Sequence, residues 1–393
     1  MHCRACGATV EPVVDLGMQP AMSRFPRPED PPDDLHPLRL GTCPSCGLVQ
    51  LADPSPPQVD QQDAPSPLTS TTMAAHARGF VDDLVARVLA TSERRILSLA
   101  SHGGHIEPFL RERGASATIV EEPLTVPDAS TGTYDLVIDN YLLAHLEHPR
   151  TALERMAALL APGGTLALEY DDLLATVEGG QWDAIGHGHP VYLSLGWLTR
   201  ELVAVGLIVV DAVPQPVYGG SVRAFARAGA YPGLSVDALL AREASAGIGA
   251  PKGLAPLAKA LDHARVDVVP HLQGARAAGR RVVGYGAPAR SITFLNALEI
   301  GPELLPLVVD RAPAKQGRTI PGVRIPIVAP EVLASEPPDE ILILTWNLVA
   351  EVRSALAPLV AGGTRLLVAL PGLADVTVDE GGAGSSGVGV TMR

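Results

Sequence analysis

Three histidines of this chain have the residue type and the surroundings to move protons. His187 and His189 stand in a Gly-His-Gly-His-Pro stretch, where glycines permit unusual backbone and expose the imidazoles, and His145 lies upstream. Imidazole titrates near neutral pH, so the three predict an acid/base cluster. Two of them could equally be scaffold residues hydrogen-bonded to backbone. A zinc site on the His187 and His189 pair lacks a third ligand at a recognisable spacing.

Four cysteines form the second chemically informative set. They make two Cys-x-x-Cys pairs near the N-terminus, Cys3 with Cys6 and Cys43 with Cys46, and a glycine follows each pair. In a chain without an export signal, this pattern favours metal ligation over disulfides. Four thiolates complete a tetrahedron with no open position, so we expect a structural Zn²⁺. The alternative is four unrelated free cysteines.

Charge and hydropathy narrow the class of protein. The 393 residues carry a formal net charge of −13 and contain no basic cluster, so nucleic acid and anionic membranes are poor partners. The N-terminus has no apolar segment of the kind found in signal peptides, and no stretch is long enough to span a bilayer. We therefore expect a cytoplasmic protein.

Composition divides the chain into four regions. We expect a zinc-binding module and linker at 1–72, an α/β domain at 73–229, a helical spacer with a second α/β domain at 230–378, and a disordered tail at 379–393. Strand-like runs alternate with helical segments in both α/β regions, which indicates βαβ units and parallel sheets. The strand candidates are Ile96–Ala100, Ala117–Val120, Leu136–Asp139, Thr165–Tyr170, Val282–Tyr285, Leu305–Asp310, Ile341–Thr345 and Arg365–Ala369.

Several motifs, in order along the chain, carry a family resemblance. They are Cys3-Arg4-Ala5-Cys6-Gly7, Cys43-Pro44-Ser45-Cys46-Gly47, Leu143-Ala144-His145-Leu146, Tyr218-Gly219-Gly220-Ser221-Val222-Arg223, Gly284-Tyr285-Gly286-Ala287-Pro288-Ala289 and Val309-Asp310-Arg311-Ala312-Pro313-Ala314-Lys315. Together they resemble the TDP-deoxysugar C-methyltransferase family, which uses S-adenosylmethionine (SAM) to methylate a carbon next to a ketone in TDP-4-keto sugars. The resemblance implies an α/β fold: an N-terminal four-cysteine zinc module followed by two doubly wound Rossmann-like domains, the first methyltransferase-like and shortened.

The resemblance and the side-chain chemistry together give the candidate site residues. The catalytic candidates are His145, His187, His189, Tyr192 and Tyr218. The substrate-binding candidates, for an intermediate such as a nucleotide sugar, are Ser221, Arg223, Tyr285, Arg290, Arg311 and Lys315. The cofactor-binding candidates are Gly103, Gly104, Glu121 and Glu122. Glu169, Asp171 and Asp172 follow a strand and suggest an acidic pocket edge, although such loop carboxylates are often only solvated.

The sequence departs from the family where the methyl donor would bind. The family's first cofactor loop reads Glu-Ile-Gly-Ser-Asn-Asp-Gly, whereas this chain has Ser98 in place of the acid and Ala100 in place of the first glycine. The short stretch from Pro123 to Tyr134 omits the βα unit that walls the adenine in the family. We therefore expect SAM binding to have been lost.

The family's catalytic stretch, Phe-Asp-x-Ile-Tyr-His-Glu-His-x-x-Tyr, has changed as well. It corresponds to residues 182–192 of this chain, called the catalytic stretch below. It keeps both histidines and Tyr192 but has Gly186 and Gly188 in place of the tyrosine and the glutamate. Those two groups are expected to serve in proton abstraction and enolate stabilisation, which a glycine cannot do by side chain.

Three functions remain open at this stage. The first is a natural-product enzyme that works without SAM and runs acid/base chemistry (isomerisation, elimination or cyclisation) on a keto-bearing intermediate. The second is a working SAM-dependent C-methyltransferase that acts on a TDP-4-keto-deoxysugar. The third is a non-catalytic partner that retains the fold to stabilise or regulate another biosynthetic protein.

Overall fold

The computed structural model describes most of the chain. The described residues are 1–21, 25–56, 70–88, 94–100, 106–120, 126–127 and 132–378. The predicted cofactor residues Gly103, Gly104, Glu121 and Glu122, and the predicted tail at 379–393, lie outside them.

The first sheet joins the cysteine module to a strand from much later in the chain. Within the described residues it has four antiparallel strands in the order β1-β2-β3-β8. The strands are β1 (Glu11–Pro20), β2 (Leu35–Thr42), β3 (Val49–Leu51) and β8 (Val191–Tyr192). Because β8 belongs to the predicted catalytic stretch, the cysteine module is built directly onto that stretch.

The second sheet has the predicted strands at its centre. Its order in the described chain is β5-β4-β6-β7-β10-β9. The strands are β4 (Ile96–Ala100), β5 (Ala117–Val120), β6 (Tyr134–Asn140), β7 (Leu160–Asp171), β9 (Ile208–Gln215) and β10 (Ser221–Arg227). The first four run parallel as predicted, whereas β10 is antiparallel to both of its neighbours.

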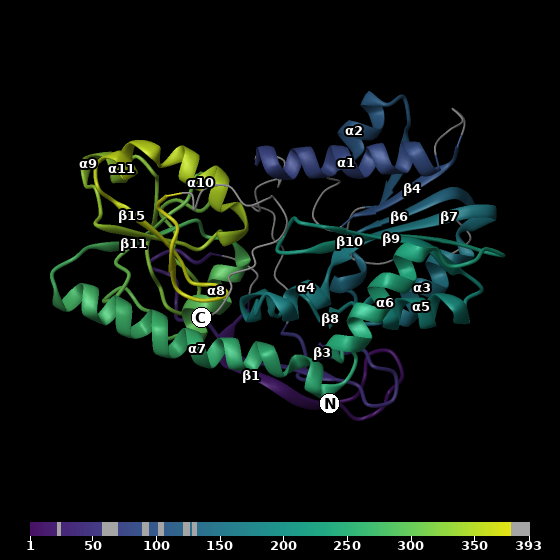
Figure 1. Ribbon diagram of the computed structural model, residues 1–393, viewed down its shortest axis with the longest axis horizontal. Coiled ribbons are helices and arrows are strands. Elements are labelled where there is room, and N and C mark those ends of the chain that lie inside the picture. The colour runs from purple at the N-terminus through teal and green to yellow at the C-terminus, as the bar shows by residue number, and fades with distance from the viewer. Residues whose placement is uncertain are drawn as a thin grey trace.

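Helices cover both faces of this second sheet (Figure 1). On one face lie α1 (Thr71–Arg87) and α2 (Glu107–Glu112). On the other lie α3 (Pro149–Ala158) and α5 (Leu195–Ala204), while α4 (Leu173–Glu178) follows β7. Burial on both faces explains why the central residues of these strands, 136–138 of β6 and 166–168 of β7, are all apolar.

The third sheet forms the core of the C-terminal domain. Its order in the described chain is β13-β12-β11-β14-β15-β16, and only β16 runs antiparallel to its neighbour. The strands are β11 (Val282–Tyr285), β12 (Val308–Val309), β13 (Ile327–Val328), β14 (Glu340–Ile343), β15 (Arg365–Val368) and β16 (Ala374–Asp375). The helices are α8 (Ala289–Ala297), α9 (Val332–Ser335), α10 (Val349–Ala355) and α11 (Ala357–Ala361).

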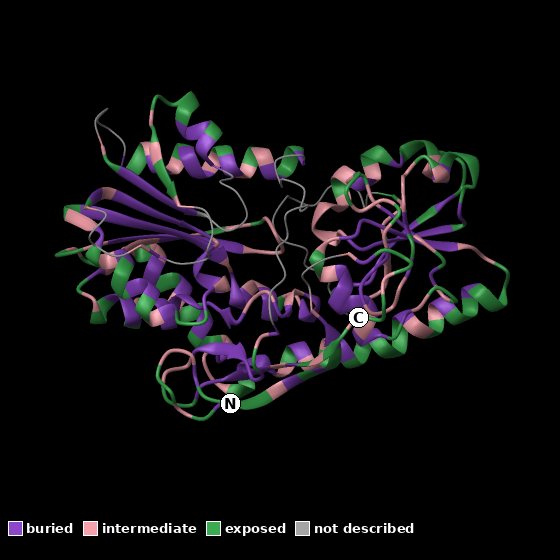
Figure 2. Cartoon of the chain, turned by 180° about the vertical axis from the view of Figure 1, so that it is seen from behind, coloured by how far each residue is buried: buried purple, intermediate pink, exposed green. Residues whose placement is uncertain are grey.

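The predicted helical spacer connects all three parts. It consists of α6 (Leu234–Ala246) and the long α7 (Pro251–Ala277), which runs from beside the cysteine module along the C-terminal domain (Figure 1). Buried side chains of β1, α7 and the third sheet form one hydrophobic cluster, and the buried strands are enclosed by largely exposed outer helix faces (Figure 2). The cysteine module and the C-terminal domain are therefore packed on one core.

No helix in the described ranges combines the length and apolar character needed to cross a membrane.

Candidate active site

A cavity of about 720 Å³ lies between the methyltransferase-like domain and the C-terminal domain. It opens where parallel strands of both sheets end, since its lining includes Tyr141 after β6, Asp171 at the end of β7, Tyr285 at the end of β11 and Thr345 after β14. Ligands of doubly wound sheets bind at the carboxyl ends of strands. The volume is within the range of pockets that take a small-molecule ligand.

Two of the three predicted histidines meet in this cavity. The rings of His145 and His189 pack edge to face with centroids 4.5 Å apart. Nδ1 of His145 is 2.7 Å from the carbonyl oxygen of Gly188, and because a carbonyl only accepts, this nitrogen carries the proton. In the neutral ring Nε2 is then the basic nitrogen.

Asp171 completes the cluster as a carboxylate beside His189. Its Oδ2 lies 3.9 Å from Nδ1 of His189. Burial raises the pKa of Asp171 to about 6, the nearby positive charge of Arg290 opposes this rise, and the negative charge of Glu169 adds to it. A carboxyl group that changes charge near neutral pH suits a general base. Sequence analysis identified Asp171 only as part of an acidic pocket edge.

Two tyrosines form the wall next to this cluster. Tyr218 and Tyr141 have ring centroids 5.4 Å apart, and both have left-handed backbone, with φ of 55° and 63°. Burial holds the pKa of Tyr218 above its usual range, so the phenol stays protonated and can donate a hydrogen bond. Sequence analysis missed Tyr141, whose only signal is its position directly after a buried strand.

Cationic and aromatic side chains line the C-terminal side of the cavity. Arg311 donates to Glu351 at 2.8 Å, and Lys315 donates to the carbonyl of Ala287 at 2.7 Å. Burial lowers the pKa of Lys315. Tyr285 and Arg290 lie on the same wall. The structure thus brings together all four of the C-terminal candidates for substrate binding.

The remaining candidates in the described chain lie outside the cavity lining. His187 is buried, with Nδ1 and Nε2 each 3.2 Å from a backbone carbonyl, of Pro20 and Pro37 respectively. The hydroxyl of Tyr192 accepts a hydrogen bond from the amide of Gly186 at 2.8 Å. Both side chains therefore stabilise the backbone of the catalytic stretch: His187 through the first sheet, and Tyr192 through a contact within the stretch.

Ser221 and Arg223 lie within the sheet instead of facing a ligand. Ser221 is fully buried at the start of β10. Arg223 is also buried and donates to Glu169 and to Asp83 of α1, both at 2.7 Å. Because its guanidinium is already paired with two carboxylates, Arg223 joins α1 to the sheet.

His187 gives the first testable prediction, because its surroundings suit a structural role. We expect His187→Ala to lower the free energy of unfolding by about 1–3 kcal/mol, since it opens a cavity and removes the hydrogen bond that the neutral imidazole donates to one of the two carbonyls. Urea denaturation measures this change. His263→Ala on the exposed face of α7 is the matched control and should change stability by less than about 0.5 kcal/mol. Equal stability of the two variants would contradict the structural role.

The positions that lack the family's tyrosine and glutamate both lie on the cavity. Gly186 and Gly188 belong to its lining, and a Cβ at Gly188 would meet no atom within 4 Å. At Gly188 the missing side chain therefore leaves open space in the cavity.

The residues predicted to bind the methyl donor lie outside the described chain, which includes only the neighbouring edge of the second sheet. β5 is the outer strand of the second sheet in the described chain, and Ile119 on it is 37% exposed. The described residues between β5 and β6, at 126–127 and 132–133, form no strand.

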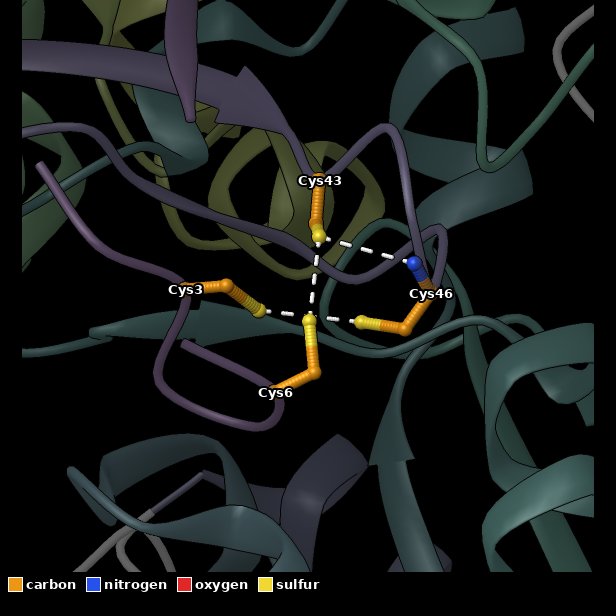
Figure 3. A group of neighbouring side chains, drawn as sticks. All are labelled: Cys3, Cys6, Cys43 and Cys46. Atoms are coloured by element: carbon orange, nitrogen blue, oxygen red, sulfur yellow. Dashed lines mark hydrogen bonds between the residues drawn. The ribbon is translucent and has the colours of Figure 1, made fainter. Parts of the chain in front are cut away.

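The four cysteines converge as the spacing predicts. Their sulfurs point toward one another from two loops (Figure 3) and all lie within 4.8 Å of one another. Cys3 and Cys46 have Sγ atoms 3.6 Å apart, and those of Cys6 and Cys43 are 3.5 Å apart. A tetrahedron with Zn–S bonds of about 2.3 Å has edges of about 3.8 Å, so the cluster fits such an ion.

A four-cysteine module followed by two α/β domains is also the order of three family models, one of which is a methyltransferase domain. Family models match along most of the chain. They are "Putative zinc binding domain" at residues 3–59, "Methyltransferase domain" at 73–212 and "C-methyltransferase C-terminal domain" at 216–371.

A curated relative extends over nearly the whole chain. The C-methyltransferase NovU of Streptomyces niveus is 30% identical over 407 aligned positions, which cover 94% of this chain and 95% of NovU. The chain therefore belongs to the C-methyltransferase family.

Solved structures match the chain only in part. The CcbJ methyltransferase of Streptomyces caelestis is 15% identical, covers 43% of this chain and 100% of its own, and has a TM-score of 0.32. Magnesium protoporphyrin IX methyltransferase of Synechocystis PCC 6803, solved with S-adenosylhomocysteine, is 15% identical, covers 40% of this chain and 83% of its own, and has a TM-score of 0.30. TM-scores this low do not support an assignment, so membership of the C-methyltransferase family depends on the family models and on NovU.

Proposed function

We propose that this protein is a biosynthetic enzyme that performs acid/base chemistry without SAM on a keto-bearing intermediate, such as a nucleotide-linked keto-deoxysugar. The convergence of His145, His189, Asp171 and Tyr218 on one cavity carries the proposal. These side chains supply proton acceptors and a protonated phenol, the groups needed to form an enolate.

The first chemical step is removal of a proton from the carbon next to the ketone. The C–H bond breaks, its proton passes to the Asp171 and His189 pair, and its electrons form a C=C bond while the carbonyl π electrons move to oxygen. Tyr218 donates a hydrogen bond to that oxygen. Where the deprotonated carbon bears a hydroxyl, transfer of the hydroxyl proton to the former carbonyl oxygen and return of the abstracted proton to the former carbonyl carbon give isomerisation. Loss of a substituent from the carbon on the other side of the deprotonated carbon gives elimination. Attack of the enolate carbon on an electrophilic carbon of the same substrate, with departure of the leaving group from that carbon, gives cyclisation.

The cationic wall supports a substrate that carries negative charge. Arg311 and Lys315 belong to the cavity lining near strand ends of the C-terminal domain, beside their carboxylate partners Glu351 and Asp310. Guanidinium and ammonium groups at such strand ends are suited to a diphosphate. This arrangement supports a nucleotide sugar as the substrate class.

A second candidate is SAM-dependent C-methylation of a TDP-4-keto-deoxysugar. The 30% identity with NovU, whose name is C-methyltransferase, favours it. It shares the proton-abstraction step with the first proposal. The exposed edge of β5 and the glycines at 186 and 188 support the proposal without SAM.

We also propose Zn²⁺ as the ion of the four-cysteine cluster, in a purely structural role. Four thiolates fill its coordination sphere and leave no position for substrate. Reduced thiols persist in the cytoplasm, where we place the protein.

Two measurements on the purified full-length protein separate the two functions. We expect titration with SAM and with S-adenosylhomocysteine to give no binding heat. We expect a TDP-4-keto-6-deoxyhexose in D₂O to gain deuterium next to its ketone, detected by NMR. Micromolar SAM binding with methyl transfer would replace the first proposal by the second. Absence of exchange would remove keto-deoxysugars as substrates.

A further inference from the structure

The turn that carries Tyr218 is held by contacts that cross the domain boundary. Tyr218, Gly219 and Gly220 all have positive φ, of 55°, 89° and 124°. Such backbone is uncommon, and for a tyrosine it persists only where surrounding contacts impose it. The contacts on this turn therefore decide where the Tyr218 phenol lies.

Arg290 of α8 supplies the contact from the C-terminal domain. Its Nη2 donates to the carbonyl oxygen of Tyr218 at 2.7 Å, and its Nη1 donates to Oε1 of Gln181 at 3.1 Å. Gln181 in turn donates from Nε2 to the carbonyl oxygen of Gly219 at 2.6 Å. The Arg290 guanidinium thus fixes two successive carbonyls of the turn. It bonds that of Tyr218 directly and that of Gly219 through the side-chain amide of Gln181.

The guanidinium is itself fixed by the protein. It lies over the ring of Trp346, 5.4 Å from its centroid, and 4.0 Å from the buried Asp183. Asp183 accepts a hydrogen bond from Nε1 of Trp346 at 2.9 Å. Arg290 is therefore held in one orientation by an aromatic face and a carboxylate.

We propose that Arg290 is a positioning residue, through which the C-terminal domain sets the Tyr218 turn and so completes the acid/base site. The consequence for catalysis rests on the proposed function, whereas the hold on the turn does not. The reading of Arg290 as a substrate-binding residue is the alternative.

Arg290 also acts on the base side of the site. Its charge favours the carboxylate form of Asp171. The other groups around Asp171 are His189, Glu169, Tyr141, Tyr192 and Tyr218. Loss of the cation raises the pKa of Asp171, so the pH at which the base form appears moves upward.

Hydrogen exchange of the zinc-loaded full-length protein tests the hold on the turn. In Arg290→Met we expect backbone amides of the 218–220 turn to exchange at least tenfold faster than in the wild type. Arg290→Lys keeps the charge but loses the second N–H group of the guanidinium. Its turn amides should exchange at a rate between those of the wild type and Arg290→Met, and this variant remains informative if the methionine variant fails to fold. Arg265→Met removes an arginine of a solvent-exposed ion pair on α7 and is the matched control. Unchanged exchange in both Arg290 variants would overturn the proposal.

Kinetics of deuterium uptake by the keto sugar separate positioning from substrate binding. A positioning role lowers kcat and moves the acid limb of the pH profile upward in Arg290→Met. A rise in KM alone, with unchanged turn exchange, would assign Arg290 to substrate binding and refute the proposed role. If the wild type exchanges no substrate deuterium, the proposed function fails, while amide exchange still decides whether Arg290 holds the turn.

Discussion

Cys43→Ser is expected to remove the bound metal and to disorder the catalytic stretch, although Cys43 does not line the cavity. Binding of structural zinc contributes on the order of 10 kcal/mol to the folding of small modules. β3 pairs with β8 through Val49 and Tyr192, so loss of the module also releases the segment that carries His189. We expect the melting temperature to fall by about 10 °C or more.

Metal analysis, thermal melts and hydrogen exchange of residues 186–192 measure this effect. Ser45→Ala is the control, because Ser45 is an exposed residue of the loop between Cys43 and Cys46. This variant should keep one equivalent of zinc. Full protection of residues 186–192 in metal-free Cys43→Ser would show that the module does not hold the catalytic stretch. Iron instead of zinc would correct the assignment of the ion.

His189→Ala is expected to lower kcat for deuterium uptake by about 10²–10⁴-fold, with little change in melting temperature. His189 contacts both His145 and Asp171, and its side chain is 32% exposed at the cavity, so its removal costs little packing. The wild-type rate should rise through about pH 6, because the pKa of Asp171 is raised to about 6 and its deprotonated form is the active base.

His148→Ala is the control for this variant, since His148 is exposed at the start of α3 and lies outside the cavity lining. Asp171→Asn should abolish the rise near pH 6, because asparagine does not titrate. A His189→Ala rate within a factor of three of the wild type would exclude His189 as part of the base and leave His145 to be tested.

Local patterns were sufficient to predict most of the parallel strands, although the two-residue β13 was missed. The predicted runs Ile96–Ala100, Ala117–Val120 and Val282–Tyr285 have the same bounds as β4, β5 and β11. Buried parallel strands are continuous apolar runs, and a short window of sequence contains that signal. The two Cys-x-x-Cys pairs were equally local, since each loop fixes its own two sulfurs.

Pairings between distant segments could not be predicted in this way. β8 has only two residues, and its assignment depends on pairing with β3, which no sequence window near it contains. Likewise, His187 and His189 each follow a glycine, so their local sequences are nearly the same. Only the positions of β1 and β2 decide that His187 faces Pro20 and Pro37 while His189 faces the cavity.

Pairing of β3 with β8 also has a consequence for synthesis of the chain on the ribosome. β3 emerges early, but its partner strand follows only after most of the second sheet has been translated. Until then one edge of the small sheet has unpaired backbone amides and carbonyls, a state prone to association with other chains. Expression of an N-terminal fragment that ends before β8 should therefore give aggregated protein even with zinc in excess, and fragments for biochemical work should extend beyond Tyr192.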